Sequence, residues 1–211
     1  MKGPDLAAWA SLLVLVPFAI VVVTSFVKFA VVLAILQRAF GGSALPPASV
    51  SAALALLFAL FVTAPVGEAV WAQAGPSLAK GDAASVASAV EKAATPVRAF
   101  LVKHTPLRER QSFLELQRQL RPQAERAAVG AEDLVVLAPA FAIAELKAAF
   151  QVGFLLFLPF LVIELVVATV LLSLGMNTLP PEAVSLPFKL LLFVLADGWH
   201  LLVRGLVLTY T

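Results

Sequence analysis

The chain has 211 residues, of which 61% are hydrophobic and only 13% charged, and its formal net charge is +2. This composition excludes an ordinary water-soluble domain and predicts an integral membrane protein, while the small net charge argues against nucleic-acid binding. Because the chain has no cysteine, disulfides, thiolate metal sites and cysteine nucleophiles are excluded. The two histidines, His104 and His200, are too scattered for a zinc motif.

Four apolar segments follow one another along the chain, and each is long enough to cross a bilayer. They are approximately residues 6–36, 48–71, 134–174 and 184–208. The first is longer than the apolar region of a secretory signal, so we interpret it as a retained helix. The third exceeds one span, and we expect Pro159 to kink or divide it. Unbroken runs rich in Leu and Ala predict helices and not strands.

These segments form two hairpins whose turns resemble each other. The first turn reads LPPASVS from residue 45 and the second reads LPPEAVS from residue 179. Paired prolines end the incoming helix and suit the first turn of the outgoing one. The likeness is either an internal repeat, as in other membrane proteins, or a coincidence between two proline turns.

Between the hairpins lies a polar insertion with nine Lys or Arg and seven Asp or Glu. Thr95-Pro96 and Thr105-Pro106 predict helix starts there, and Pro122 and Gly130 predict the end of the helical run. Phe113, Leu116 and Leu120 fall on one helix face, which we expect to pack on a neighbour. The predicted fold is therefore all-α and of membrane-protein type. It has a first hydrophobic hairpin (residues 1–74), a polar helical insertion (75–133) and a second hydrophobic hairpin (134–211).

Six charged residues interrupt the apolar segments: Lys28, Glu145, Lys147, Glu164, Lys189 and Asp197. A charge at the bilayer centre costs roughly 3 kcal/mol on insertion scales, so such residues usually face a partner or an aqueous path. Glu145 and Lys147 are separated by about 200° around a helix, and Lys189 and Asp197 by about 12 Å along it. Neither pair can meet locally. We expect partners on other helices, in the same or a neighbouring subunit; a proton relay is the alternative.

Enzyme signatures are missing from the sequence. It contains no Gly-x-Ser-x-Gly elbow, phosphate-binding glycine loop or His-Glu-x-x-His helix. Asp197-Gly198 is similar to the aspartate motif of intramembrane proteases, but no apolar helix carries a second one. We therefore predict no catalytic residue, no cofactor and no metal site.

Several strings, taken in order, resemble the SctR/FliP family, the large hydrophobic subunit of the type III secretion export gate. In the first hairpin they are TSFVK from residue 24, QRAFG from 37 and the Pro46-Pro47 turn. The second half carries PAF from 139, ELKAAFQVGF from 145, PFL from 159, LGM from 174, Pro180-Pro181, LPFK from 186 and DGW from 197. The resemblance runs from about residue 15 to the end of the chain.

This resemblance implies a non-enzymatic channel subunit of the bacterial inner membrane. Family members form homo-oligomers, with a pentameric pattern, together with two smaller hydrophobic subunits, and unfolded secreted proteins pass along the axis. The six charges would then be polar contacts between subunits. The turn at Gly175, Met176 and Asn177 would point into the pore, where flagellar relatives carry a methionine cluster. Only Met176 remains of that cluster, so it is either a soft constriction or ordinary apolar filling at a helix end.

Two observations favour the virulence-type injectisome branch over the flagellar one. Val27-Lys28 resembles the injectisome pattern, where flagellar members commonly have Thr-Arg. Flagellar members also often carry a cleaved signal, which we do not expect in this sequence. The alternatives are a flagellar gate, a small proton-coupled transporter with Glu164 and Asp197 as carriers, or a scaffold without a conduit. The positive-inside rule would place residues 75–133 in the cytoplasm, whereas the resemblance implies the periplasmic side.

Overall fold

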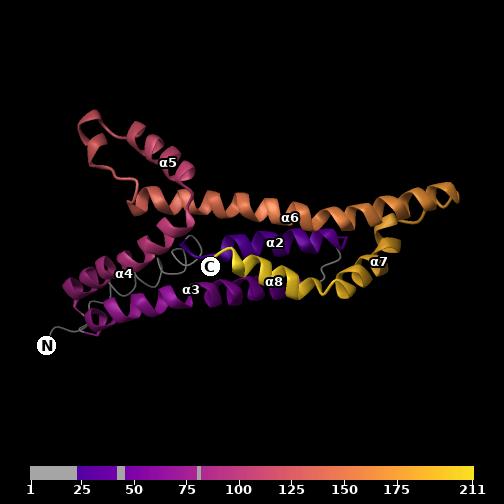
Figure 1. Ribbon diagram of the computed structural model, residues 1–211, viewed down its shortest axis with the longest axis horizontal. Helices are drawn as coiled ribbons and strands as arrows, with labels where there is room; N and C mark the ends of the chain where they lie inside the picture. Colours follow the sequence, from indigo (N-terminus) through magenta and orange to yellow (C-terminus); the bar gives the residue numbers. More distant parts are fainter. Residues whose placement is uncertain (1–22, 42–45, 80–81) are drawn as a thin grey trace. The chain divides into compact units, whose positions relative to one another are not determined.

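The computed structural model describes residues 23–41, 46–79 and 82–211, and every regular element within these ranges is a helix (Figure 1). In chain order they are α2 (Phe26–Ala39), α3 (Ala48–Leu78), α4 (Ala83–His104), α5 (Leu107–Gln119), the 3-10 helix η1 (Gln123–Ala128), α6 (Leu134–Ser173), α7 (Pro181–Leu195) and α8 (Gly198–Leu208). The predicted all-α class is confirmed.

The chain divides into two compact units, each drawn from both halves of the sequence. Unit 1 contains Ala59–Glu145 and the described end of Met1–Val27, and unit 2 contains Lys28–Phe58 and Leu146–Thr211. The helices α3 and α6 each continue from one unit into the other. The division at residues 74 and 133 was drawn from composition and stays a prediction.

Among the described residues, two helices, α3 and α6, are long and apolar enough to cross a membrane. Pro159 does not divide α6, which is helical from Leu134 to Ser173. The expected fourth span is not one helix, because α7 and α8 are bent by 61° at a break between them. Most of the first expected segment, up to residue 22, lies outside the described residues, and α2 covers its end.

The core of unit 2 is built around α2. Phe29, Val32, Leu33 and Leu36 are buried at the spacing of one helix face. Beyond the end of α2, the Phe40 ring meets Phe160 of α6 and Phe193 of α7 edge-on, with centroids 5.1 and 5.4 Å apart. Such edge-to-face pairs add roughly 0.5–1.5 kcal/mol each beyond the area that they bury. Aromatic contacts therefore join α2, α6 and α7.

The two proline turns are followed by the same pattern of burial. After Pro47 and after Pro181, the fourth, eighth and twelfth residues are buried. These residues are Ser51, Ala55 and Ala59 on α3, and Ser185, Lys189 and Phe193 on α7. Each turn therefore starts a helix with its inward face in the same register, which supports the internal repeat but leaves it a prediction.

The polar insertion differs from the expectation at Thr95-Pro96. The N-cap of α4 is Asp82, whose carboxylate accepts a hydrogen bond from the Ser85 amide at 3.3 Å, and the helix continues through Pro96. A helix-interior proline costs about 3 kcal/mol. That cost is offset because α4 buries side chains on both sides of it, including Ala89 and Leu101. The predicted helix start at residue 95 is wrong.

The helix predicted to start at Thr105-Pro106 begins there, but without the expected hydroxyl cap from Thr105. Thr105 ends α4, and α5 begins after Pro106 without a side-chain cap. No residue of α5 or η1, both described throughout, is buried. Leu116 and Leu120 are exposed, so the face expected to pack on a neighbour is not covered within the chain.

Candidate functional site

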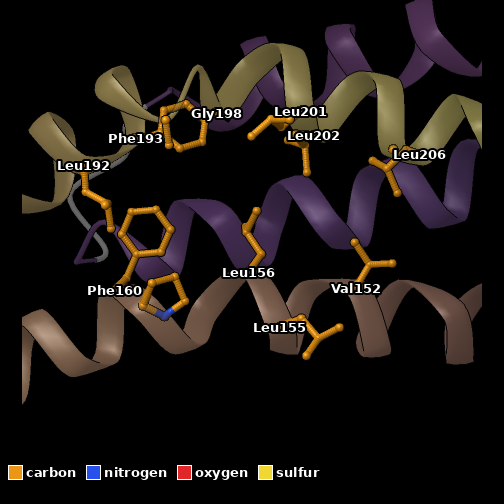
Figure 2. Close-up of a pocket in the computed structure, with 13 residues that line it drawn as sticks. Val152, Leu155, Leu156, Phe160, Leu192, Phe193, Gly198, Leu201, Leu202 and Leu206 are labelled. Atoms are coloured by element: carbon orange, nitrogen blue, oxygen red, sulfur yellow. The ribbon is translucent and has the colours of Figure 1, made fainter.

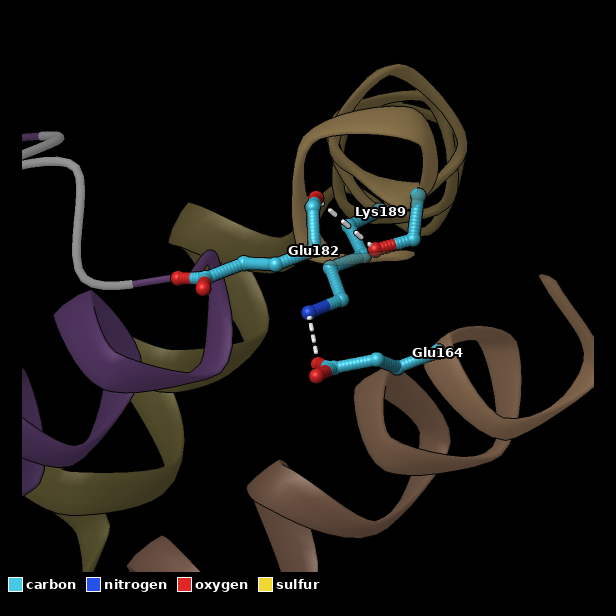
Figure 3. Close-up of polar contacts among 4 residues, drawn as sticks. Glu164, Glu182 and Lys189 are labelled. Atoms are coloured by element: carbon cyan, nitrogen blue, oxygen red, sulfur yellow. Dashed lines mark hydrogen bonds and ion pairs between the residues drawn. The ribbon is translucent and has the colours of Figure 1, made fainter. Parts of the chain in front are cut away.

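An ion pair joins two of the six predicted charges. Lys189 Nζ on α7 lies 2.6 Å from Glu164 Oε2 on α6 (Figure 3). The lysine side chain is 1% exposed and the glutamate side chain 37% exposed. The partner lies on another helix of the same chain, which is one of the two arrangements expected. An additional role for either residue between subunits stays a prediction.

The start of α7 beside this pair holds two polar residues that the sequence did not single out. Ser185 is buried and donates from Oγ to the carbonyl oxygen of Glu182 at 3.0 Å. Glu182 lies in the first turn of α7, where a carboxylate is favoured by the helix dipole. Gly41 has φ +110°, and a Cβ there would lie 2.6 Å from Cγ of Glu182. The turn after α2 therefore requires glycine for its conformation and for the space that Glu182 occupies.

Lys28 is buried on α2 and lies at the end of α8. Its Nζ donates to Thr209 Oγ1 at 3.1 Å and lies 4.1 Å from the centroid of the Tyr210 ring. Thr209 is the C-cap of α8, where the helix dipole favours a positive charge. Neither Thr209 nor Tyr210 was predicted, although Tyr210 is the only tyrosine in the sequence. Lys28 thus holds the end of the chain against α2.

Replacing Lys28 by Met should destabilise unit 2 by roughly 1–3 kcal/mol, through loss of the charged hydrogen bond and the cation–π contact. The apparent melting temperature of the detergent-purified chain measures this. Arg38→Met is the matched control, because Arg38 is exposed in the last turn of the same helix. An equal decrease in both variants would contradict the assigned role of Lys28.

Glu145 and Lys147 both lie on α6, with opposite burial. Glu145 is buried and Lys147 is exposed. This agrees with their spacing of two residues, which points them to different sides of the helix. Their predicted role between subunits is not tested by the single chain.

Asp197 lies at the break between α7 and α8, and it is exposed. Its backbone is left-handed, with φ 49° and ψ 47°, and its side chain makes no capping hydrogen bond to α8. The left-handed conformation costs roughly 1–2 kcal/mol for most residues. Burial of Leu202 and Leu206 on α8, at roughly 1.5–3 kcal/mol each, outweighs it. The sequence suggested that Asp197 is a charge within a straight apolar helix. The structure places it at a break between two helices instead.

The turn after α6 contains Gly175, Met176 and Asn177. The Met176 amide donates to the Leu171 carbonyl at 2.9 Å and the Gly175 amide to the Leu172 carbonyl at 3.1 Å. With Gly175 at φ 73°, these bonds form a Schellman motif that ends the helix. Met176 is 43% exposed, so it does not fill the core of its own chain. The constriction and ordinary apolar filling at a helix end both stay predictions.

Two cavities of unit 2 are lined almost wholly by apolar side chains. One, of about 490 Å³, lies among α6, α7 and α8 and is lined by Val152, Phe160, Phe193 and Leu202, among others (Figure 2). Among the described residues, no three His, Cys, Asp or Glu side chains come together in a group that could hold a metal ion. The polar features of the site are thus an ion pair, a buried lysine and helix termini, which hold the helices of the chain together.

The sequence matches the FliP family over residues 10–206. It is 44% identical over 209 residues to the hypersensitivity response secretion protein HrcR of Ralstonia nicotianae, covering 98% of this chain and 96% of that protein. It is 43% identical over 202 residues to the Yop proteins translocation protein R of Yersinia pestis (95% and 93%). It is 42% identical over 198 residues to the flagellar biosynthetic protein FliP of Pectobacterium carotovorum (94% and 75%). The chain therefore belongs to the FliP family, the export-gate subunits of type III secretion.

Proposed function

We propose that this chain is a core subunit of the injectisome branch of that gate, an inner-membrane channel for unfolded secreted proteins. It acts without catalysis or a cofactor. The branch is supported by Val27-Lys28 and by relatives named for secretion and translocation at 43–44% identity, against 38–42% for the flagellar FliP relatives. A flagellar gate is the alternative within the same family.

The observation that carries the proposal is the small buried share of the two spanning helices. Only 17% of the most apolar window of α3 and 11% of that of α6 is buried within the chain. Along α6, exposed residues recur every three or four positions: Lys147, Phe150, Phe154, Leu158, Leu161 and Leu165. Such a stripe is suited to helix–helix packing. We propose that this exposed stripe is buried by further copies of the chain, in the pentameric pattern of the family, and by two smaller hydrophobic subunits.

The charges contribute to this assembly as polar contacts between subunits. The proposed set is Lys28, Glu145, Lys147, Glu164 and Lys189, whereas Asp197, the sixth charge expected from the sequence, is assigned a different role below. Lys147 is exposed on the stripe, and Glu164 is partly exposed although its Oε2 is ion-paired. Because the Glu164 side chain is 37% exposed, another chain that packs over it would have to supply a polar partner. Glu164 is therefore the strongest member of the set.

The turn at Gly175, Met176 and Asn177 forms the constriction of the channel. Its support is that Met176 and neighbouring leucines are exposed at the end of an apolar hairpin. A thioether side chain can adapt to many substrate side chains, and the left-handed Gly175 fixes where the helix stops.

A stalled substrate tests the channel. With a photoreactive residue at Met176, we expect a crosslink to a secreted protein arrested in transit, within a high-mass complex on native gels. The same residue at Leu191, which is exposed on α7, should give no crosslink. Crosslinking at Leu191 alone would contradict the constriction, and absence of the high-mass complex would contradict the gate.

The ion pair also disfavours the proton-coupled transporter. A carrier carboxylate must bind and release protons freely. In the structure Glu164 is instead held by an ion pair with Lys189, whose side chain is 1% exposed. The pair thus suits a fixed structural contact better than a carrier.

A further inference from the structure

The inward face of the chain changes at the break between α7 and α8. On α7, Lys189 and Phe193 are buried four residues apart, and on α8 Leu202 and Leu206 are buried four apart. Phe193 and Leu202 are nine residues apart, so an uninterrupted helix would place them about 180° apart. The two buried stripes could not then face the same side.

The same uninterrupted helix would also turn a charge inward. Arg204 follows Phe193 by eleven residues, which is about 20° from alignment with Phe193 on a regular helix. In the structure Arg204 is exposed. The break therefore has two effects, because it brings the leucines of α8 to the inward side and leaves Arg204 outside.

The backbone of Asp197 produces this change. Among the described residues, Asp197 is the only one other than glycine with a positive φ. Gly198 follows, and a Cβ there would overlap the Phe193 ring. The Trp199 ring then meets Phe193 edge-on at 5.3 Å. The chain thus passes close over Phe193 while it turns into α8.

We propose that Asp197 is a positioning residue, which acts through its left-handed backbone to reset the inward face between α7 and α8. Its carboxylate is not required for this. Asp and Asn adopt the left-handed conformation more readily than other side chains, and Gly adopts it freely. This inference goes beyond the proposed function and departs from the expectation that the charge of Asp197 joins subunits.

Two substitutions separate the backbone from the charge. Asp197→Asn removes the charge but keeps a side chain that tolerates the left-handed conformation, whereas Asp197→Glu keeps the charge on a side chain that does not. If the left-handed backbone of residue 197 produces the bend, the Asn and Gly variants should retain it and the Glu and Val variants should lose it. If the carboxylate produces the bend, the Glu variant should retain it and the Asn and Gly variants should lose it.

The bend is measured directly by a distance between two spin labels. The chain has no native cysteine, so Ala183→Cys on α7 and Leu208→Cys on α8, both exposed, can be labelled specifically in the full chain, diluted with unlabelled chain. From the helix rise and the 61° bend, straightening should lengthen this distance by about 5 Å. Asn and Gly variants should keep the original distance, and the Glu variant should give a longer or broader one.

Assembly with the two smaller subunits, followed on native gels, is the second readout. We expect a high-mass complex for Asn and Gly variants and less of it for the Glu variant. A Glu variant that assembles and keeps the distance, beside an Asn variant that does neither, would overturn the inference. If the unchanged protein forms no complex, the proposed function fails, but the label distances still decide the role of Asp197. If the Val variant does not fold, the comparison of Asn with Glu stands alone.

Discussion

Replacing Glu164 by Gln should destabilise unit 2 by roughly 1–3 kcal/mol, between the cost of breaking an exposed ion pair and that of breaking a fully buried one, because the Glu164 side chain is 37% exposed. The reason is that Lys189 is 1% exposed and would lose the carboxylate 2.6 Å away without gaining contact with water. Lys189→Met should cost less, because the Glu164 that it leaves unpaired is 37% exposed and can reach a polar phase. The double variant Glu164→Gln/Lys189→Met should be more stable than Glu164→Gln alone.

The apparent melting temperatures of the three purified variants in detergent measure this order. Glu68→Gln provides the matched control, since Glu68 is an exposed carboxylate on the apolar helix α3. It should leave the melting temperature nearly unchanged. An equal effect of Glu164→Gln and Glu68→Gln would show that the pair contributes no stability. If Lys189→Met proved the more damaging single change, the argument from burial would be wrong.

The helical class was predictable because long runs of Leu and Ala leave no period-two pattern. The inward face of α2 was readable as well, since Phe29, Val32, Leu33 and Leu36 have helical spacing. The pairing of Glu164 with Lys189 was not found, although a signal existed. The two residues lie almost equally far along their helices from the turn that joins α6 to α7, and in an antiparallel hairpin such positions face each other.

The break at Asp197 was missed for a different reason. Mean hydropathy over residues 184–208 reports only avoidance of water, and it does not show in which direction each side chain points. The break is seen from burial, which places Phe193 and Leu202 on the inward side although they cannot align on one straight helix. The contact of Lys28 with Thr209 depends on the tertiary path of α8, and no local pattern indicates it.

Close packing of α2 on α6 gives the last prediction, a substitution at a buried glycine. A Cβ on Gly153 would overlap Cδ1 of Ile35 and lie 3.2 Å from its Cβ. Gly153→Ala should therefore lower stability by roughly 1–3 kcal/mol through overpacking, although alanine favours the helix itself. Ile35→Val removes the overlapping methyl group and should restore part of the loss in the double variant.

Gly205→Ala is the matched control for this prediction, because it lies in a helix of the same unit and a Cβ there meets no atom within 4 Å. It should raise stability by roughly 0.5–1 kcal/mol, since alanine loses less backbone entropy than glycine. The two Gly→Ala changes should thus have opposite signs in apparent melting temperature. If both raised it, α2 and α6 would have room for a methyl group between them. If Ile35→Val cost the same with and without Gly153→Ala, the two side chains would not be coupled, and the close approach of the helices would have to rest on other residues.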